Sequence, residues 1–136
     1  MAELLDDLFS READFTPDRE RQERGLRILV GRQPGMSLVL VAETQGTVVG
    51  MATVQLLIST AEGGRAGLVE DVVVDREHRG KGIGRLLLGG ITDWARKLDV
   101  TRLQLLADRD NRSALHFYQA AGWSPTNLIC LRNIVG

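Results

Sequence analysis

The sequence predicts the α/β class, with a central twisted mixed β-sheet flanked by about four helices. Apolar stretches rich in β-branched residues alternate with segments of helical periodicity, which is the first reason for this prediction. The second is the stretch "LVEDVVV", which is apolar almost throughout, as strands covered on both faces are. A chain of 136 residues with 43% hydrophobic content is long enough for one core and too short for two. We therefore expect a single domain over residues 1–136, in the order ααβββαβαβ.

Two helices are expected before the sheet. Apolar residues at helical spacing predict a short amphipathic helix at the N-terminus. These residues are Leu4, Leu5, Leu8 and Phe9. A second helix should begin near Thr16 and Pro17, because threonine is a good N-cap and proline suits the first helical position. We expect this helix to end before Gly31.

The next segments predict a hairpin and a buried strand. "SLVLVAE" and "TVVGMATVQLLI" are apolar and β-branched, and "TQGT" between them supplies a tight turn. We interpret "STAEGGRAG" as a connecting loop and "LVEDVVV" as the strand that follows it. Two acids, Glu70 and Asp71, stand out in that strand among apolar neighbours.

The C-terminal half predicts helices and strands in alternation. An apolar stripe that starts at Ile83 predicts an amphipathic helix, and "RLQLLAD" predicts a short strand. A further helix should cover residues 112–121 and end at Gly122, since glycine is favoured just beyond a helix C-terminus. "LICLRNIV" predicts a closing strand, with Cys130 as a small core residue. The stripe consists of Ile83, Leu87, Ile91, Trp94 and Leu98.

Charge and cysteine content exclude several classes of function. The formal net charge is −1, so there is no overall positive field to hold a nucleic acid or an anionic membrane. One cysteine allows no internal disulfide, and no cluster of cysteines and histidines predicts a metal site. Neither a signal peptide nor an apolar run of membrane-spanning length is visible. We expect a cytoplasmic protein with no metal and no nucleic-acid or membrane partner.

A glycine-rich basic turn lies between the buried strand and the next helix. Three glycines and three cations make up six of the seven residues from Arg79 to Arg85. Gly82 and Gly84 allow a tight turn without a Cβ, so backbone N–H groups can converge on an anion at the helix N-terminus. Lys81 adds charge at the same point. The spacing therefore predicts a cradle for a phosphate or pyrophosphate.

Two common phosphate-binding motifs do not fit this turn. A P-loop requires glycine, lysine and then serine or threonine in succession, and the sequence has no such run. A dinucleotide fingerprint that started at Gly82 would need a third glycine where Leu87 stands. The ligand must therefore be identified from a second motif.

That second motif is "DRDNRSALHFYQAAGWSP". In the predicted helix, Ala114, Phe117 and Ala121 share the face that we expect to meet the core. Asn111 and Tyr118 lie seven residues apart, which is two turns along one side of the helix. A single groove could therefore receive both polar side chains.

With these two motifs the chain resembles the N-acetyltransferases of the GNAT superfamily, which transfer an acyl group from acyl-coenzyme A to an amine. "VEDVVVDREHRGKGIG" is similar to the family's strand and R/Q-x-x-G-x-G/A loop. "NRSALHFYQAAGW" is similar to its N-x-x-A-x-x-F-Y-x-x-x-G-F/W segment. The specific similarity covers about residues 67–123 and has both motifs in the family's order.

The resemblance implies a site for acetyl-coenzyme A as cosubstrate. Main-chain groups at Val72, Val73 and Val74 would pair with the pantetheine arm like an added strand. Asn111 matches the family position that contacts the pantetheine region, and Tyr118 the one that faces the coenzyme sulfur. The glycine-rich turn would hold the pyrophosphate through backbone amides and charge. Its residues are Arg79, Gly80, Lys81, Gly82, Ile83, Gly84 and Arg85.

Acetyl transfer to an amine calls for a base and an acid. An alkylamine with a pKa near ~10.4 is mostly protonated at neutral pH, so a carboxylate, directly or through water, should accept a proton. Glu70 lies where the family often places its base. Asp71 is the alternative, because side chains alternate across a regular strand and a β-bulge can change which one faces the site. Tyr118 is the candidate acid for the departing thiolate, whereas His78 and His116 are poor candidates for the base.

We therefore predict an N-acetyltransferase that moves acetyl from acetyl-coenzyme A to a primary amine by direct attack in a ternary complex. The alternative is a non-catalytic module that binds acyl-coenzyme A as a sensor or scaffold. The acceptor would be a small-molecule amine or an amine of a peptide or protein. Residues 1–30 hold eight acidic and five basic side chains, which favours a cationic or neutral acceptor. The resemblance also implies a possible homodimer through the C-terminal strands.

Overall fold

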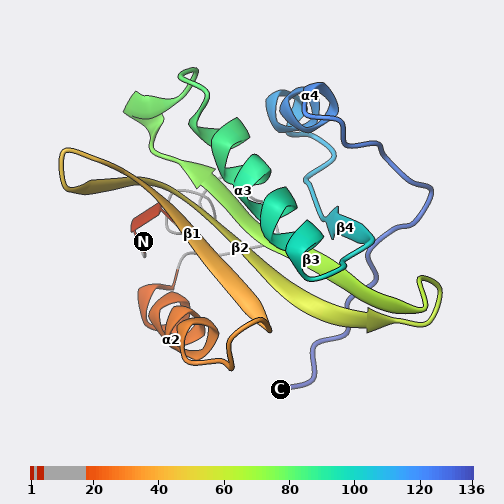
Figure 1. Ribbon diagram of the computed structural model, residues 1–136. Helices are drawn as coiled ribbons and strands as arrows, with labels where there is room; N and C mark the ends of the chain where they lie inside the picture. The colour runs from red at the N-terminus through yellow and green to blue at the C-terminus, as the bar shows by residue number, and fades with distance from the viewer. Residues whose placement is uncertain (2, 5–17) are drawn as a thin grey trace. The chain divides into compact units, whose positions relative to one another are not determined.

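The computed structural model describes residues 1, 3–4 and 18–136. The chain divides into two compact units, Met1–Leu105 and Leu106–Gly136, and each is described by itself. The first unit contains the sheet with the helices that cover it, and the second contains the C-terminal helix and tail (Figure 1).

The sheet has four strands in the order β1-β2-β3-β4. β1 (Ser37–Thr44), β2 (Thr47–Ser59) and β3 (Gly64–Val74) are antiparallel neighbours. β4 (Arg102–Leu105) runs parallel to β3, at one edge of the sheet. Figure 1 shows β2 and β3 as the long central pair. The predicted mixed sheet is therefore confirmed.

The two hairpins of the sheet differ in how well they were predicted. β1 and β2 join through Gln45 and Gly46, with φ of 51° and 78°, the positive values that a tight type I′ turn requires. The predicted connecting loop "STAEGGRAG" is wrong for most of its residues. Only residues 60–63 form a turn, and the others belong to β2 and β3. Ser59 pairs with Gly64, so the backbone hydrogen bonds of a long ladder outweigh the low strand propensity of glycine.

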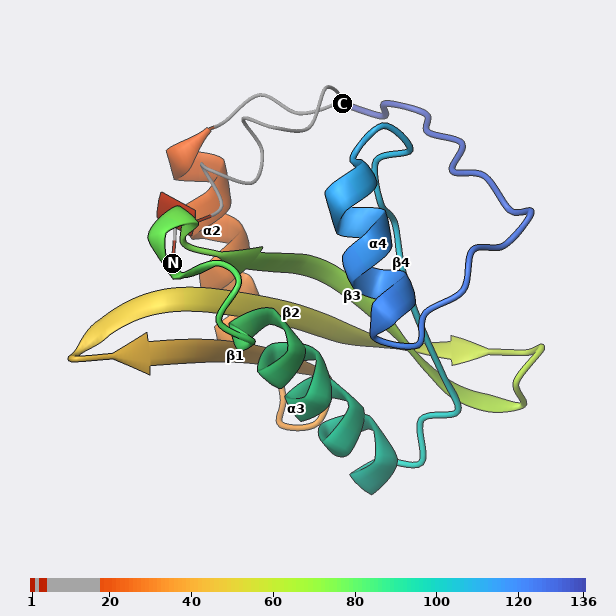
Figure 2. The ribbon, with the colours of Figure 1, turned by 90° about the horizontal axis from the view of Figure 1, so that it is seen from above.

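Helices α2 (Arg19–Val30) and α3 (Ile83–Lys97) cover opposite faces of the sheet (Figure 2). Asp18 is the N-cap of α2, and its Oδ1 accepts a hydrogen bond of 3.1 Å from the backbone N–H of Arg21. The helix therefore begins two residues after the predicted Pro17, which lies outside the described residues together with Thr16. It ends before Gly31, as predicted.

The predicted first helix lies mostly outside the described residues. Glu3 and Leu4 are helical, and the Leu4 side chain is buried, whereas Leu5, Leu8 and Phe9 are not described. Leu4 joins Leu26 of α2 and two strand residues, Met51 and Val73, in one apolar cluster. This cluster forms the core on the α2 side of the sheet.

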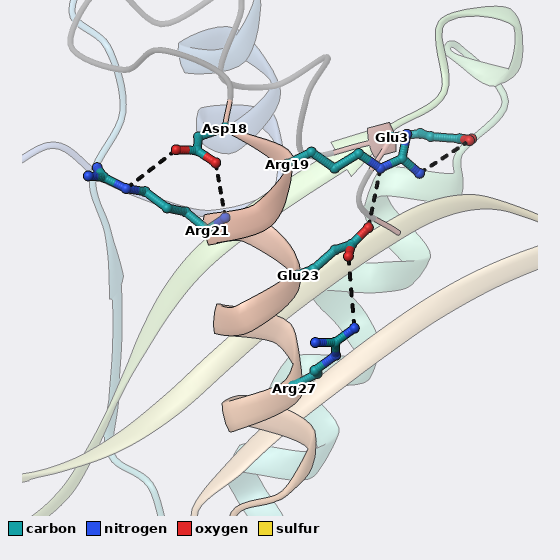
Figure 3. A network of polar contacts seen from close by, with 6 residues as sticks. All are labelled: Glu3, Asp18, Arg19, Arg21, Glu23 and Arg27. Atoms are coloured by element: carbon teal, nitrogen blue, oxygen red, sulfur yellow. Dashed lines mark hydrogen bonds and ion pairs between the residues drawn. The ribbon is translucent and has the colours of Figure 1, made fainter.

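The solvent-facing side of α2 carries a chain of ion pairs (Figure 3). Nitrogen–oxygen distances in these pairs range from 3.3 to 3.9 Å. Exposed pairs of this kind contribute little to stability, since water screens them. They do show that several acids of the N-terminal region are matched by arginines. The pairs are Arg19–Glu3, Arg19–Glu23, Arg21–Asp18 and Arg27–Glu23.

Helix α3 approaches the sheet closely because two glycines remove side chains from the contact. A Cβ built on Gly50 of β2 would lie 3.1 Å from Ile83 Cγ2 and 3.3 Å from Leu87 Cδ1. A Cβ built on Gly90 of α3 would lie 2.7 Å from Leu40 Cδ1 of β1. The buried face of α3 confirms the predicted apolar stripe at its centre. It consists of Leu87, Leu88, Ile91 and Ala95.

The second unit contains α4 (Arg112–Ala120) and the tail. The helix ends in a Schellman motif: Gly122 has a φ of 96°, its N–H donates to Gln119 O, and the N–H of Trp123 donates to Tyr118 O. This motif confirms the predicted role of Gly122. The described α-helices are therefore α2, α3 and α4, with the helical Glu3 and Leu4 in addition.

Two predictions for the tail are wrong. Residues 124–136 contain no strand, and the Cys130 side chain is exposed rather than part of a core. The segment has the composition of a strand, but no described strand pairs with it, so its backbone lacks the ladder that defines a β-strand. Its apolar side chains are mostly solvent-accessible, from 69% at Ile129 to 94% at Val135.

Candidate active site

A β-bulge places Glu70 and Asp71 in different environments. Thr53 of β2 pairs with Asp71, and the next residue, Val54, pairs with Val69. Glu70 is therefore the extra residue on β3, as in a bulge. The Glu70 side chain is exposed, and Asp71 is only 7% exposed. Of the two acids, Glu70 is thus the one that a dissolved amine can reach.

Thr53 and Asp71 form a reciprocal hydrogen-bonded pair. The Thr53 hydroxyl donates to Asp71 Oδ2 over 2.7 Å, and its oxygen accepts from the Asp71 backbone N–H over 3.2 Å. Both residues are buried, so the pair satisfies polar groups that would be costly without partners. Thr53 was not among the residues that the sequence singled out. Its signal was a polar side chain in the middle of an otherwise apolar strand.

Burial raises the pKa of the Asp71 carboxyl above its ordinary value. The Thr53 hydrogen bond opposes this shift, and the negative charge of Glu70 adds to it. The charged form of Asp71 is therefore disfavoured in the folded protein. Such a group contributes stability below the pKa of the unfolded chain and loses that contribution as pH rises through the folded pKa.

We expect Asp71→Asn to gain stability relative to the wild type as pH rises from about 4 to 8. The wild type bears the cost of a buried charge over this range, and the asparagine variant does not ionise. Urea unfolding of both proteins at several pH values measures the difference. Asp93→Asn, which removes an exposed carboxylate from α3, is the control. A difference between Asp71→Asn and wild type that stayed constant with pH would contradict the buried-charge account.

The edge of β3 is open beyond the bulge. β4 pairs with β3 only from Ala66 to Val69, so residues 70–74 have β2 as their single strand neighbour within the described residues. Val72 and Val74 pair with β2, and Val73 is buried on the α2 side. An extended ligand can therefore hydrogen-bond to this stretch of backbone as an added strand does.

Side-chain contacts hold the chain where β3 ends. The Nε of Arg79 donates to the carbonyl oxygen of Val74 over 3.0 Å. His78 Nδ1 lies 2.9 Å from Asp75 Oδ2, and this hydrogen bond holds the pKa of Asp75 below its ordinary value. The short 3₁₀ turn Arg76–His78 lies between these contacts. The glycine-rich turn therefore leaves the strand from an anchored position.

The glycine-rich turn has the backbone of an anion cradle. Gly80 and Gly82 adopt left-handed φ values of 75° and 85°, on either side of Lys81. Gly82 is also the N-cap of α3, and no side chain caps this helix end. The helix N-terminus therefore presents backbone N–H groups to an anion. The sequence singled out Gly82 and Gly84 for the tight turn, whereas the residues with positive φ are Gly80 and Gly82, and Gly84 belongs to the first turn of α3.

The remaining predicted residues lie on α4. Asn111 is its N-cap, and its Oδ1 accepts a 3.2 Å hydrogen bond from the backbone N–H of Ala114. The half-buried Tyr118 ring lies 5.2 Å from the Phe117 ring and 6.0 Å from the Trp123 ring, between ring centres. Asn111 thus has a structural role of its own, and the Tyr118 ring is held by aromatic neighbours.

Two further observations concern metal-ligating groups and membrane-spanning helices. The described part of the chain has no group of three metal-ligating side chains that could hold an ion. In the same part, every helix is too short or too polar to cross a membrane.

Comparisons with known proteins agree with the motifs. The family model described as "Acetyltransferase (GNAT) family" matches residues 1–123. An uncharacterized N-acetyltransferase, YobR, of Bacillus subtilis (strain 168) is 28% identical over 119 residues, which cover 88% of this chain and 44% of YobR. The L-amino acid N-acyltransferase MnaT of Escherichia coli (strain K12) is 34% identical over 88 residues, 65% of this chain and 51% of MnaT. The chain thus spans about half the length of these relatives.

Solved structures show the same fold. The crystal structure of a transcriptional regulator from Bacillus halodurans C-125 has a TM-score of 0.84 at 21% identity, covering 98% of this chain and 91% of that one. An aminoglycoside acetyltransferase, meta-AAC0020, from an uncultured soil metagenomic sample has a TM-score of 0.79 at 20% identity, covering 98% and 85%. At these identities the likeness establishes the fold, which confirms the predicted α/β class.

Proposed function

Because the chain belongs to the acetyltransferase (GNAT) family, we propose that it is an N-acetyltransferase that moves acetyl from acetyl-coenzyme A to a primary amine. The observation that carries this proposal is the pair of left-handed glycines, Gly80 and Gly82, at the uncapped start of α3. This turn follows the open edge of β3, so a phosphate group and an extended pantetheine arm have adjacent places to bind. Basic side chains of Lys81 and Arg85 add charge for the pyrophosphate.

The proposed reaction is a direct transfer within a ternary complex. The Glu70 carboxylate accepts a proton from the acceptor, and the neutral amine nitrogen then attacks the thioester carbonyl. A carbon–nitrogen bond forms and the carbon–sulfur bond breaks. Tyr118 gives its hydroxyl proton to the departing thiolate. The attached nitrogen then loses its second proton, which restores the Tyr118 hydroxyl through solvent, and Glu70 releases its proton to bulk water. The products are the N-acetylated acceptor and free coenzyme A.

The acceptor and the setting of the reaction are also part of the proposal. MnaT is named for L-amino acids, and a Trypanosoma brucei brucei relative, 34% identical over 86 residues, is named for glucosamine 6-phosphate. We propose a polar small-molecule amine, with a peptide amine as the second class. We further propose that residues 1–136 act as a single domain in the cytoplasm and that the chain can form a homodimer.

We expect Gly82→Trp to weaken acetyl-coenzyme A binding at least about tenfold, which corresponds to roughly 1.4 kcal/mol. An L-residue at a φ of 85° is strained, and a Cβ there points into open space, where the proposed pyrophosphate lies. Isothermal titration calorimetry measures the binding, and a thiol-release assay with a panel of amines measures turnover.

The matched control for this variant is Gly63→Trp. Gly63 also has a positive φ, 68°, and open space at its Cβ, but it lies in the turn between β2 and β3 at the other end of the sheet. Equal losses in both variants would attribute the effect to backbone strain alone. Wild-type binding without turnover of any amine would favour the sensor or scaffold, and no wild-type binding would contradict both functions.

A further inference from the structure

Gln22 is a buried amide without a hydrogen bond. It lies on the sheet-facing side of α2 and is only 7% exposed. Neither Nε2 nor Oε1 has a hydrogen-bond partner among the described residues. Buried polar groups in folded proteins almost always have hydrogen-bond partners. A buried group without a partner has lost its hydrogen bonds to water and has gained none in the protein, which destabilises the fold. Gln22 therefore requires a specific explanation.

The surroundings of Gln22 connect it with the bulge. Leu26 lies one helical turn further along α2 on the same face, and it belongs to the apolar cluster with Met51 and Val73. Asp71 and Val73 lie two residues apart on β3, so their side chains face the same side of the sheet. Gln22 lies one helical turn from Leu26, and Asp71 lies two residues from Val73, so Gln22 and the bulge border the same apolar cluster on the α2 side of the sheet.

The buried polar side chains all lie on the α2-facing side of the sheet. Within the described residues, the buried polar side chains are Gln22, Thr53 and Asp71. Thr53 lies two residues from Met51 on β2, and therefore on the α2-facing side as well. Thr53 and Asp71 satisfy each other, which leaves Gln22 as the one with unused hydrogen-bonding capacity in this part of the chain.

We propose that Gln22 is a specificity-determining residue that binds a neutral hydroxyl or carboxamide group of the acceptor. This inference rests on the proposed acetyl transfer and names its substrate class. The amide offers a donor and an acceptor side by side. A hydroxyl or a carboxamide can use both, whereas an ammonium group only donates and a carboxylate only accepts. The acceptor would be an amine that carries such a group, held with its nitrogen near Glu70.

The test compares Gln22→Leu with the wild type. Leucine has a similar size but no polar atoms. We expect the KM for glucosamine and for serinamide to rise about tenfold or more, since a site built to hydrogen-bond a substrate group discriminates strongly. The KM for acetyl-coenzyme A, and the rate with cyclohexylamine, which has no hydroxyl, should change less than about twofold. The melting temperature should rise by about 2–4 °C, because the orphaned amide is gone.

The rise in melting temperature distinguishes ligand binding from a structural role. A glutamine satisfied within the protein would make Gln22→Leu less stable, and an unchanged KM for both hydroxylated and amide probes would overturn the inference. Gln33→Leu, at an exposed turn position, controls for the added apolar side chain. It should change neither the KM values nor the melting temperature.

Direct binding of the probes separates this inference from the proposed function. Calorimetric titration with glucosamine and serinamide needs no turnover. Binding by the wild type that Gln22→Leu weakens, without acetyl transfer, would support Gln22 as the binding residue and contradict the enzyme. Acetylation of cyclohexylamine alone, with no binding of glucosamine or serinamide, would support the proposed acetyltransferase activity and overturn the inference about Gln22.

Discussion

Replacing Glu70 by glutamine should lower kcat by about 10²–10⁴-fold at neutral pH, the range typical of losing a general base. Glutamine keeps the size of the side chain but cannot accept the amine proton. Glu70 is the extra, exposed residue of the bulge, so the change leaves the β2–β3 ladder intact. Acetyl-coenzyme A binding should therefore stay the same, and single-turnover kinetics beside calorimetry measure the two quantities.

Two further variants decide which group acts as the base. Glu62→Gln removes an exposed carboxylate from the β2–β3 turn and should leave kcat unchanged. If Asp71→Asn lost activity and Glu70→Gln did not, the base would be Asp71. If both variants stayed active, proton transfer would run through water without either carboxylate. Each result therefore identifies a different group, Glu70, Asp71 or water, as the base that takes the proton from the amine.

Replacing Tyr118 by phenylalanine should lower kcat by about 10²-fold. The change removes only the hydroxyl that would protonate the thiolate. The aromatic ring remains, so its contacts with Phe117 and Trp123 should persist. Thiol release in single-turnover experiments measures the effect.

Tyr118→Leu is the matched variant, because it removes both the hydroxyl and the ring. It should lose stability as well as activity, since its aromatic neighbours Phe117 and Trp123 would lose their ring partner. A Tyr118→Phe variant with full kcat would exclude Tyr118 as the acid and leave solvent to protonate the thiolate.

The parts of the fold that depend on local patterns were predictable. The apolar, β-branched composition of β1 and β2 and the turn with Gly46 predicted the first hairpin, and the apolar stripe predicted α3. Gly122 was recognisable because a left-handed residue after a helix is usually glycine. These features depend on interactions between residues close in sequence.

Other features depend on partners that a single sequence does not name. The tail has strand composition but no strand neighbour in the described part of the chain, so Cys130 is exposed. The second hairpin extends through glycines because β2 supplies a long ladder opposite them. Propensity describes one segment at a time, whereas a strand exists only as part of a pair.

In the candidate site, too, some features follow from the local sequence and others depend on residues distant in the sequence. The glycine-rich turn and its charge were visible in the sequence, but which glycines take positive φ depends on where α3 begins. The sequence leaves open which of Glu70 and Asp71 faces outward, and the register of β3 against Thr53 decides that it is Glu70. Gln22 gave no signal beyond its four-residue spacing from Leu26, because only the fold shows that its amide is buried.

The close approach of α3 to the sheet determines how freely its first turn can move. At Gly50 the Ile83 and Leu87 side chains of α3 pack directly on the backbone of β2, and at Gly90 the Leu40 side chain of β1 packs directly on the backbone of α3. The start of α3 therefore has little room to shift against the sheet. The N–H groups at this end are therefore ordered when the chain folds. A ligand that binds there meets a preorganised site and does not lose affinity to ordering it.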